Sequence, residues 1–134
     1  NKGQFEIEVL SNQCCEFAMV NPNNQGLSAR FSWMATAERK SGNGPLQSIK
    51  KLDLHDGEEH YWSAAPRGFV NEPLMVPNPH STIEDDGWIV VLTWNGERVG
   101  TDLVILKAKD LSEQAVIELP IAIPYGLHGS WVAN

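Results

Sequence analysis

Short β-type runs separated by strong turn signals constrain this chain more than any other feature of its sequence. The clearest pair is 88–94 (WIVVLTW) and 101–106 (TDLVIL), which flank a loop that begins with Asn95-Gly96. Asn-Gly favours tight hairpins because both residues tolerate positive φ. Similar runs cover 5–10, 30–37, 46–54, 58–63, 69–76 and 115–119. Roughly eight short strands predict an antiparallel all-β sandwich, barrel or propeller, and the pattern alone does not choose among these.

Length and composition fit one soluble β domain over residues 1–134. The chain has 134 residues, 42% hydrophobic and 20% charged, which is ordinary for a globular protein with a real core. No apolar run approaches the length of a membrane span. The segment 41–45 (SGNGP) combines strong turn formers, and it predicts an internal boundary between substructures.

Charge and cysteine content restrict the partners and the compartment. The net charge is −7, and residues 71–134 hold −6 of it. Nucleic-acid binding needs clustered Lys and Arg, so this class of function is excluded, and attraction to anionic lipid is disfavoured. Hydrophobic contact with a membrane stays open. The two cysteines, Cys14 and Cys15, are neighbours that cannot form an unstrained disulfide. We therefore expect reduced thiols and a cytoplasmic location.

Two runs in the second half of the chain carry candidate functional residues. In 124–131 (PYGLHGSW), His128 lies between Gly126 and Gly129, which let the backbone approach a crowded centre. Such a histidine can direct a ring nitrogen at a metal, although spacing alone fits a surface histidine better. In 72–77 (EPLMVP), Glu72 lies on a mostly apolar strand, where a carboxylate is costly unless it is paired or solvated at an edge.

Other candidate metal-binding groups have simpler interpretations. His55, His60 and His80 match no compact ligand spacing, so we interpret them as surface residues. The acidic run 84–87 (EDDG) lacks the alternation of an EF-hand loop, which favours a solvated turn over a cation site.

These motifs together resemble the C-terminal end of the carotenoid cleavage oxygenases, which are iron enzymes that split double bonds of carotenoids and apocarotenoids. The resemblance runs from Cys15 to Trp131, with Ala18, Met75 and Leu127 as departures from the residues usual in the family. It implies an antiparallel β-propeller. The chain would then supply about the last two blades of a seven-bladed propeller.

The resemblance also implies roles for the two candidate residues. His128 would be one of four histidines that hold a catalytic Fe(2+), and Glu72 would accept a hydrogen bond from the other ring nitrogen of an iron-bound histidine. The substrates would be a carotenoid or apocarotenoid and dioxygen, and the products two carbonyl compounds. Peripheral membrane contact would involve parts outside this chain.

One expectation and two alternatives concern the activity of the chain. Three of the four ligand histidines would lie outside the chain, so we expect it to be inactive alone. Because these motifs concern iron and not substrate, a stilbene-cleaving oxygenase of the same family is an alternative. A truncated β domain without catalytic function is another.

Overall fold

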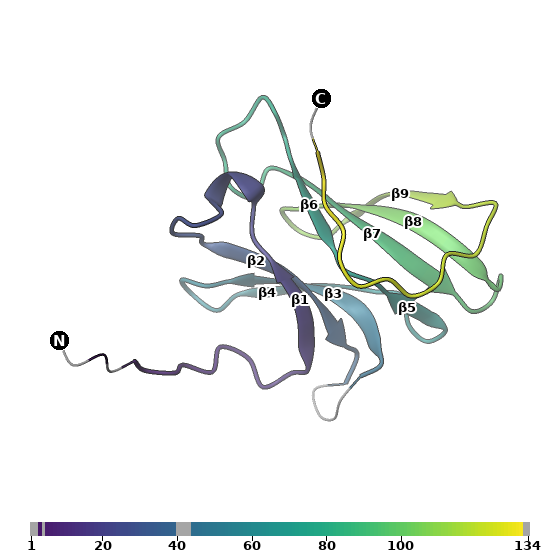
Figure 1. Ribbon diagram of the computed structural model, residues 1–134, viewed down its shortest axis with the longest axis horizontal. Helices are drawn as coiled ribbons and strands as arrows, with labels where there is room; N and C mark the ends of the chain where they lie inside the picture. Colours follow the sequence, from purple (N-terminus) through teal and green to yellow (C-terminus); the bar gives the residue numbers. More distant parts are fainter. Residues whose placement is uncertain (1–2, 4, 40–43, 133–134) are drawn as a thin grey trace.

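The computed structural model describes residues 3, 5–39 and 44–132, and within them the chain consists almost entirely of β-strands and loops (Figure 1). One turn of 3-10 helix, η1 (Pro22–Asn24), is the helical element among these residues. The strands are β1 (Cys15–Met19), β2 (Phe31–Ala37), β3 (Leu46–Asp53), β4 (Glu59–Ser63), β5 (Gly68–Val70), β6 (Leu74–Pro77), β7 (Gly87–Asn95), β8 (Gly100–Lys107) and β9 (Glu113–Glu118). The predicted all-β class is therefore confirmed. In the described ranges no helix is long and apolar enough to cross a bilayer.

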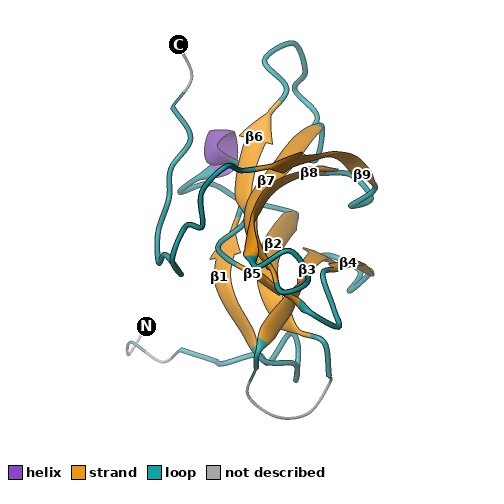
Figure 2. Ribbon diagram, turned by 90° about the vertical axis from the view of Figure 1, so that its right-hand side faces the viewer, coloured by secondary structure: helices purple, strands orange, loops and turns teal. Residues whose placement is uncertain are grey.

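The strands form two antiparallel sheets that lie one above the other in Figure 2. The four-stranded sheet keeps the sequence order β1-β2-β3-β4. The five-stranded sheet has the order β5-β7-β8-β9, and β6 also pairs with β7. The β7–β8 hairpin aligns Trp88 with Lys107 and Asn95 with Gly100, so the Asn-Gly signal lies at the predicted turn.

The core lies between the two sheets. Burial alternates along β7, where Ile89 and Val91 are buried and Trp88 is exposed, as expected for a strand with one face on a core. Trp33 of β2 is fully buried and donates its Nε1–H to the carbonyl oxygen of Ala108 at 2.9 Å, which ties the sheets together. The core cluster consists of Trp33, Ala35, Ile49, Val70, Met75, Ile89, Val91, Val104, Leu106, Ala108 and Leu111.

The internal boundary predicted at 41–45 stays a prediction. Residues 40–43 lie outside the described residues. The strands on either side, β2 and β3, pair with each other from Phe31–Asp53 to Ala37–Leu46. Strands β2 and β3 are therefore neighbours within one sheet, and the chain changes sheet between β4 and β5, at residues 64–67.

The strand predicted over residues 5–10 does not form. The segment is irregular, and Phe5 and Ile7 are each 82% exposed. Figure 1 shows it running away from both sheets. Alternation of apolar and acidic residues predicts a strand only where a neighbouring strand accepts the backbone hydrogen bonds. In the described part of the chain, this segment is not paired with any strand.

The strand predicted over residues 69–76 is divided in two. β5 ends at Val70 and β6 begins at Leu74. Pro73 has no N–H for the ladder and restricts the residue before it, so pairing is interrupted at Glu72. Asn71 still donates its backbone N–H to the carbonyl of Leu92 at 3.0 Å. The interruption places Glu72 between two strands of the same sheet.

The acidic turn before β7 binds the other sheet, so its interpretation as a solvated turn is wrong. Glu84 Oε1 accepts the backbone N–H groups of Arg30 and Phe31 at 2.8 and 2.9 Å. Asp85 pairs with the buried Lys51 of β3 at 2.6 Å. These acids therefore fix the position of one sheet relative to the other.

Candidate functional site

After β9 the chain runs back across the five-stranded sheet as an extended segment, residues 119–132 (yellow in Figure 1). Ile123 donates its backbone N–H to Thr101 Oγ1 at 2.8 Å. The phenol of Tyr125 donates to the carbonyl oxygen of Val70 at 2.9 Å. Burial raises the pKa of Tyr125, which keeps this phenol a donor. These two hydrogen bonds hold the segment against the sheet, so that its next residues lie beside the start of β6.

The segment then meets Glu72, whose two carboxylate oxygens bind it at two points. Oε1 lies 3.1 Å from Nδ1 of His128. Oε2 accepts the backbone N–H of Gly129 at 2.5 Å. One carboxylate thus fixes both the imidazole ring and the backbone beside it. The structure brings together the two residues that the sequence singled out, His128 and Glu72.

This pairing determines which ring nitrogen of His128 is available. A neutral imidazole that donates through Nδ1 carries its lone pair on Nε2, which lies on the opposite side of the ring. The His128 side chain is 77% exposed, whereas Glu72 is only 13% exposed. The carboxylate is therefore shielded while the ring remains accessible, as a ring that binds an external group requires.

The two glycines around His128 differ in what they permit. A Cβ on Gly129 would lie 3.3 Å from Cδ1 of Leu74, so the absence of a side chain allows close approach to β6. A Cβ on Gly126 would meet no described atom within 4 Å. The predicted crowding is therefore found at Gly129 and is wrong for Gly126.

A pocket of about 370 Å³ lies beside this pair, against the face of β7 and β8 that points away from the core. Its walls are mostly aliphatic and aromatic, with Glu72 and His128 among the polar groups. Apolar walls with few polar groups are typical of sites for apolar small molecules. The lining residues are Asn71, Glu72, Leu74, Val90, Leu92, Leu103, Gly126, Leu127, His128, Gly129 and Trp131.

Phe17 of β1 is a member of this site that the sequence did not indicate. Its ring centroid lies 5.8 Å from that of His128, with an interplanar angle of 86°. β1 is an edge strand of the four-stranded sheet, whereas Glu72 lies between β5 and β6 of the five-stranded sheet. The site therefore combines side chains from both sheets. A run of sequence around Phe17 could not predict a contact with a segment so distant in the chain.

The remaining candidate histidines lie elsewhere. His55 and His80 are in exposed turns, and His60 on β4 pairs with Glu58 at 3.2 Å. In the described ranges, no three His, Cys, Asp or Glu residues gather as a metal site. Cys14 and Cys15 are free thiols. The donor set thus fits iron in one respect only: it offers a single imidazole, oriented by a carboxylate, that could be one ligand of a metal.

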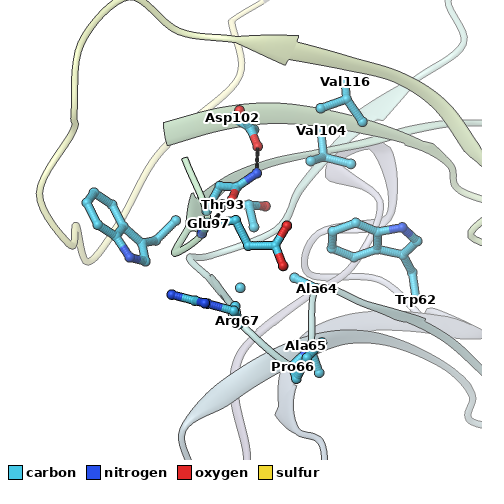
Figure 3. Close-up of a pocket in the computed structure, with 13 residues that line it drawn as sticks. Trp62, Ala64, Ala65, Pro66, Arg67, Thr93, Glu97, Asp102, Val104 and Val116 are labelled. Atoms are coloured by element: carbon cyan, nitrogen blue, oxygen red, sulfur yellow. Dashed lines mark hydrogen bonds between the residues drawn. The ribbon is translucent and has the colours of Figure 1, made fainter. Parts of the chain in front are cut away.

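A second pocket of about 370 Å³ opens between the sheets (Figure 3). No residue lines both pockets. Trp62, Val104 and Val116 form its apolar side. Arg67 lies at the wall and donates to the carbonyl of Gly96 at 3.2 Å, so it anchors a loop. Histidine is absent from its lining residues.

Two packed antiparallel sheets, with a histidine and a carboxylate paired beside the outer face of one of them, characterise this domain. The structure of this chain superposes on a solved structure of cobalt-substituted Synechocystis ACO (apocarotenoid oxygenase) with a TM-score of 0.92. The two sequences are 41% identical, and the match covers 95% of this chain and 27% of that one. The chain therefore shares the fold of that propeller protein over the matched region.

The chain belongs to the retinal pigment epithelial membrane protein family, whose model matches residues 1–133. It is 42% identical over 128 residues to apocarotenoid-15,15'-oxygenase of Synechocystis sp., covering 94% of this chain and 26% of that protein. It is 29% identical over 137 residues to lignostilbene-alpha,beta-dioxygenase isozyme III of Sphingomonas paucimobilis, covering 94% and 28%. The resemblance to carotenoid cleavage oxygenases is confirmed. The chain spans about a quarter of the length of these relatives.

Proposed function

We propose that the chain is the C-terminal portion of a non-haem iron(II)-dependent dioxygenase that cleaves a conjugated double bond of a carotenoid or apocarotenoid. The observation that carries this proposal is that the Glu72 carboxylate contacts both Nδ1 of His128 and the backbone N–H of Gly129. A carboxylate on Nδ1 orients an imidazole and increases the basicity of Nε2, which is the usual arrangement around a metal-bound histidine. The similarity to apocarotenoid-15,15'-oxygenase supports the substrate class.

In this proposal each residue of the site has a defined task. His128 offers Nε2 as one ligand, and Glu72 holds the ring and its tautomer. The pocket lined by Leu74, Val90 and Leu92 provides an apolar surface that can hold an apolar substrate. Ferrous iron, when bound, supplies the activation of dioxygen for double-bond cleavage. The other protein ligands come from outside this chain, because one imidazole cannot hold ferrous iron in a defined geometry.

The test uses a polypeptide that contains this chain together with the upstream region that its relatives possess. We expect His128→Ala to lower bound iron and apocarotenoid cleavage together, since a ligand is lost. Glu72→Ala should lower iron affinity roughly 10–100-fold, as the loss of a partner that orients a ligand does. His80→Ala, in an exposed turn, is the matched control. Iron content and product formation that are unchanged in His128→Ala would contradict the proposal.

A stilbene is the second candidate substrate, and one observation favours it. The chain is 29% identical to the lignostilbene dioxygenase and 37% identical over 93 residues to resveratrol cleavage oxygenase 1 of Aspergillus fumigatus. The same polypeptide, assayed with an apocarotenoid and with a hydroxystilbene, distinguishes the two classes by its products. The isolated chain should cleave neither. Cleavage by these 134 residues alone would show that the ligand set is complete without an upstream region.

A further inference from the structure

We propose that Phe17 is a positioning residue for the imidazole of His128: it fixes the plane of the ring, while Glu72 fixes the hydrogen bond at Nδ1. The inference rests on the proposed function in one respect, namely that the orientation of Nε2 serves a metal. The orientation itself is a property of this chain and is measurable without metal.

The geometry shows why Glu72 alone is insufficient. A single hydrogen bond at Nδ1 restrains one atom of the ring, and the ring can still rotate about the bond to Glu72. The His128 side chain is 77% exposed, so few neighbours limit that rotation. The Phe17 ring lies nearly perpendicular to it, at 86° and 5.8 Å between centroids. Perpendicular aromatic pairs at about 4.5–7 Å are favourable, because the positive edge of one ring meets the negative face of the other.

The backbone of Phe17 supports a specific role for its side chain. Its φ is +58°, in the left-handed region that bulky residues rarely adopt. The β1–β2 register also shifts between Glu16 and Met19, so Phe17 lies in a bulge. Bulges redirect a side chain out of the regular alternation, often beside functional sites. Gly or Asn would adopt this conformation at lower free energy, so the phenyl group must compensate through its contacts.

The competing explanation is that Phe17 only fills space, since it also packs against the core cluster. The two explanations differ in what they predict for the imidazole. A space-filling residue affects the stability of the fold but not the ring orientation of His128. A positioning residue affects that orientation even where the fold is intact.

The experiment is NMR of the chain labelled with 15N and 13C at histidine, at a pH where imidazole is neutral. His128 signals are assigned with His128→Gln. In the unsubstituted chain we expect NOEs between the Phe17 and His128 rings and a dominant Nδ1–H tautomer. Phe17→Leu should abolish the ring-current shift and increase the fraction of Nε2–H tautomer, whereas Phe17→Tyr should preserve both. Phe31→Leu, which removes an aromatic ring next to Trp33 and Lys51, is the control and should leave His128 unchanged.

The outcomes separate this inference from the proposed function. If the folded, unsubstituted chain shows no NOEs between the Phe17 and His128 rings, the positioning role is overturned. This test requires no variant. Equal His128 spectra in Phe17→Leu and in the unsubstituted chain also overturn it. In the longer, iron-binding polypeptide, Phe17→Leu should weaken iron retention roughly 10-fold and Phe17→Tyr should restore it. If the NMR result holds but no variant at His128 affects iron, the proposed function is wrong and the positioning role stands.

Discussion

At the scale of single residues, Glu72 is the side chain on which the geometry of the site depends. Its two oxygens bind groups that are 56 and 57 residues away in the sequence. Local patterns could mark His128 and Glu72 as unusual, but only the family resemblance suggested that they pair. Phe17 was missed because its contact depends on a bulge and on a positive φ, and neither has a sequence signal in Glu16-Phe17-Ala18.

Asp53 provides a test of pH dependence at the residue scale. The hydrogen bond from the Arg30 guanidinium lowers the pKa of the Asp53 carboxyl to about 2, against about 3.9 in an unfolded chain. Because the folded pKa is depressed, the stabilisation is present above about pH 4 and is lost as the pH falls toward 2. We expect Asp53→Asn to reduce the loss of unfolding free energy between pH 5 and 2, measured by urea denaturation.

The control for this prediction is Asp56→Asn. Asp56 is the weaker partner of the same guanidinium, at 3.3 Å, and both side chains of that pair are about half exposed. Exposed ion pairs contribute little, so this variant should keep the full acid dependence. If Asp53→Asn loses as much stability on acidification as the unsubstituted chain, the assigned role of Asp53 is incorrect.

At the scale of elements, strand positions followed from the sequence much better than strand partners. The runs 30–37, 88–94 and 101–106 became β2, β7 and β8 with small changes at their ends. The run 5–10 has an equally clear pattern, but in the described part of the chain no strand pairs with it. Periodicity reports which faces of a segment are apolar. It does not report which other segment will pair with it.

The contact between β3 and the turn before β7 gives a prediction about the elements. Lys51 Nζ lies 2.6 Å from Asp85, 2.7 Å from the carbonyl of Lys109 and 4.0 Å from the centroid of the Phe31 ring. The paired side chains are only 5% and 12% exposed. Lys51→Met leaves Asp85 without its cation, so we expect a loss of about 3 kcal/mol in unfolding free energy, measured by urea denaturation.

A double variant separates the ion pair from simple packing. Because apolar groups can replace a buried ion pair at little net cost, Lys51→Met with Asp85→Leu should recover much of the lost stability. Lys107→Met, at an exposed strand end, is the matched lysine control and should change stability by less than about 0.5 kcal/mol. A double variant less stable than Lys51→Met would show that Asp85 stabilises the turn without Lys51.

At the scale of the whole molecule, the five-stranded sheet is apolar on both faces. Its inner face forms the core with the other sheet. Its outer face carries the half-buried Val90 and Leu92 of β7 and Leu103 of β8, beside the exposed Trp88 and Ile117. Alternation along these strands therefore gives apolar residues at successive positions, as in strands covered on both sides. The described chain covers part of this face with residues 126–129 and 131, which line the pocket at His128.

This outer face predicts how the 134-residue chain behaves alone. Contiguous exposed apolar surface promotes association, so we expect its mass to increase with concentration in light scattering coupled to size exclusion. Ile117→Lys places a charge on the face, where Ile117 is 47% exposed, and should shift the population toward monomer. Val99→Lys, in the β7–β8 turn and 69% exposed, adds the same charge away from the face and should not. A monomer mass that stays constant with concentration would show that this face does not drive self-association. The apolar wall beside His128 would then be stable in water without a covering element.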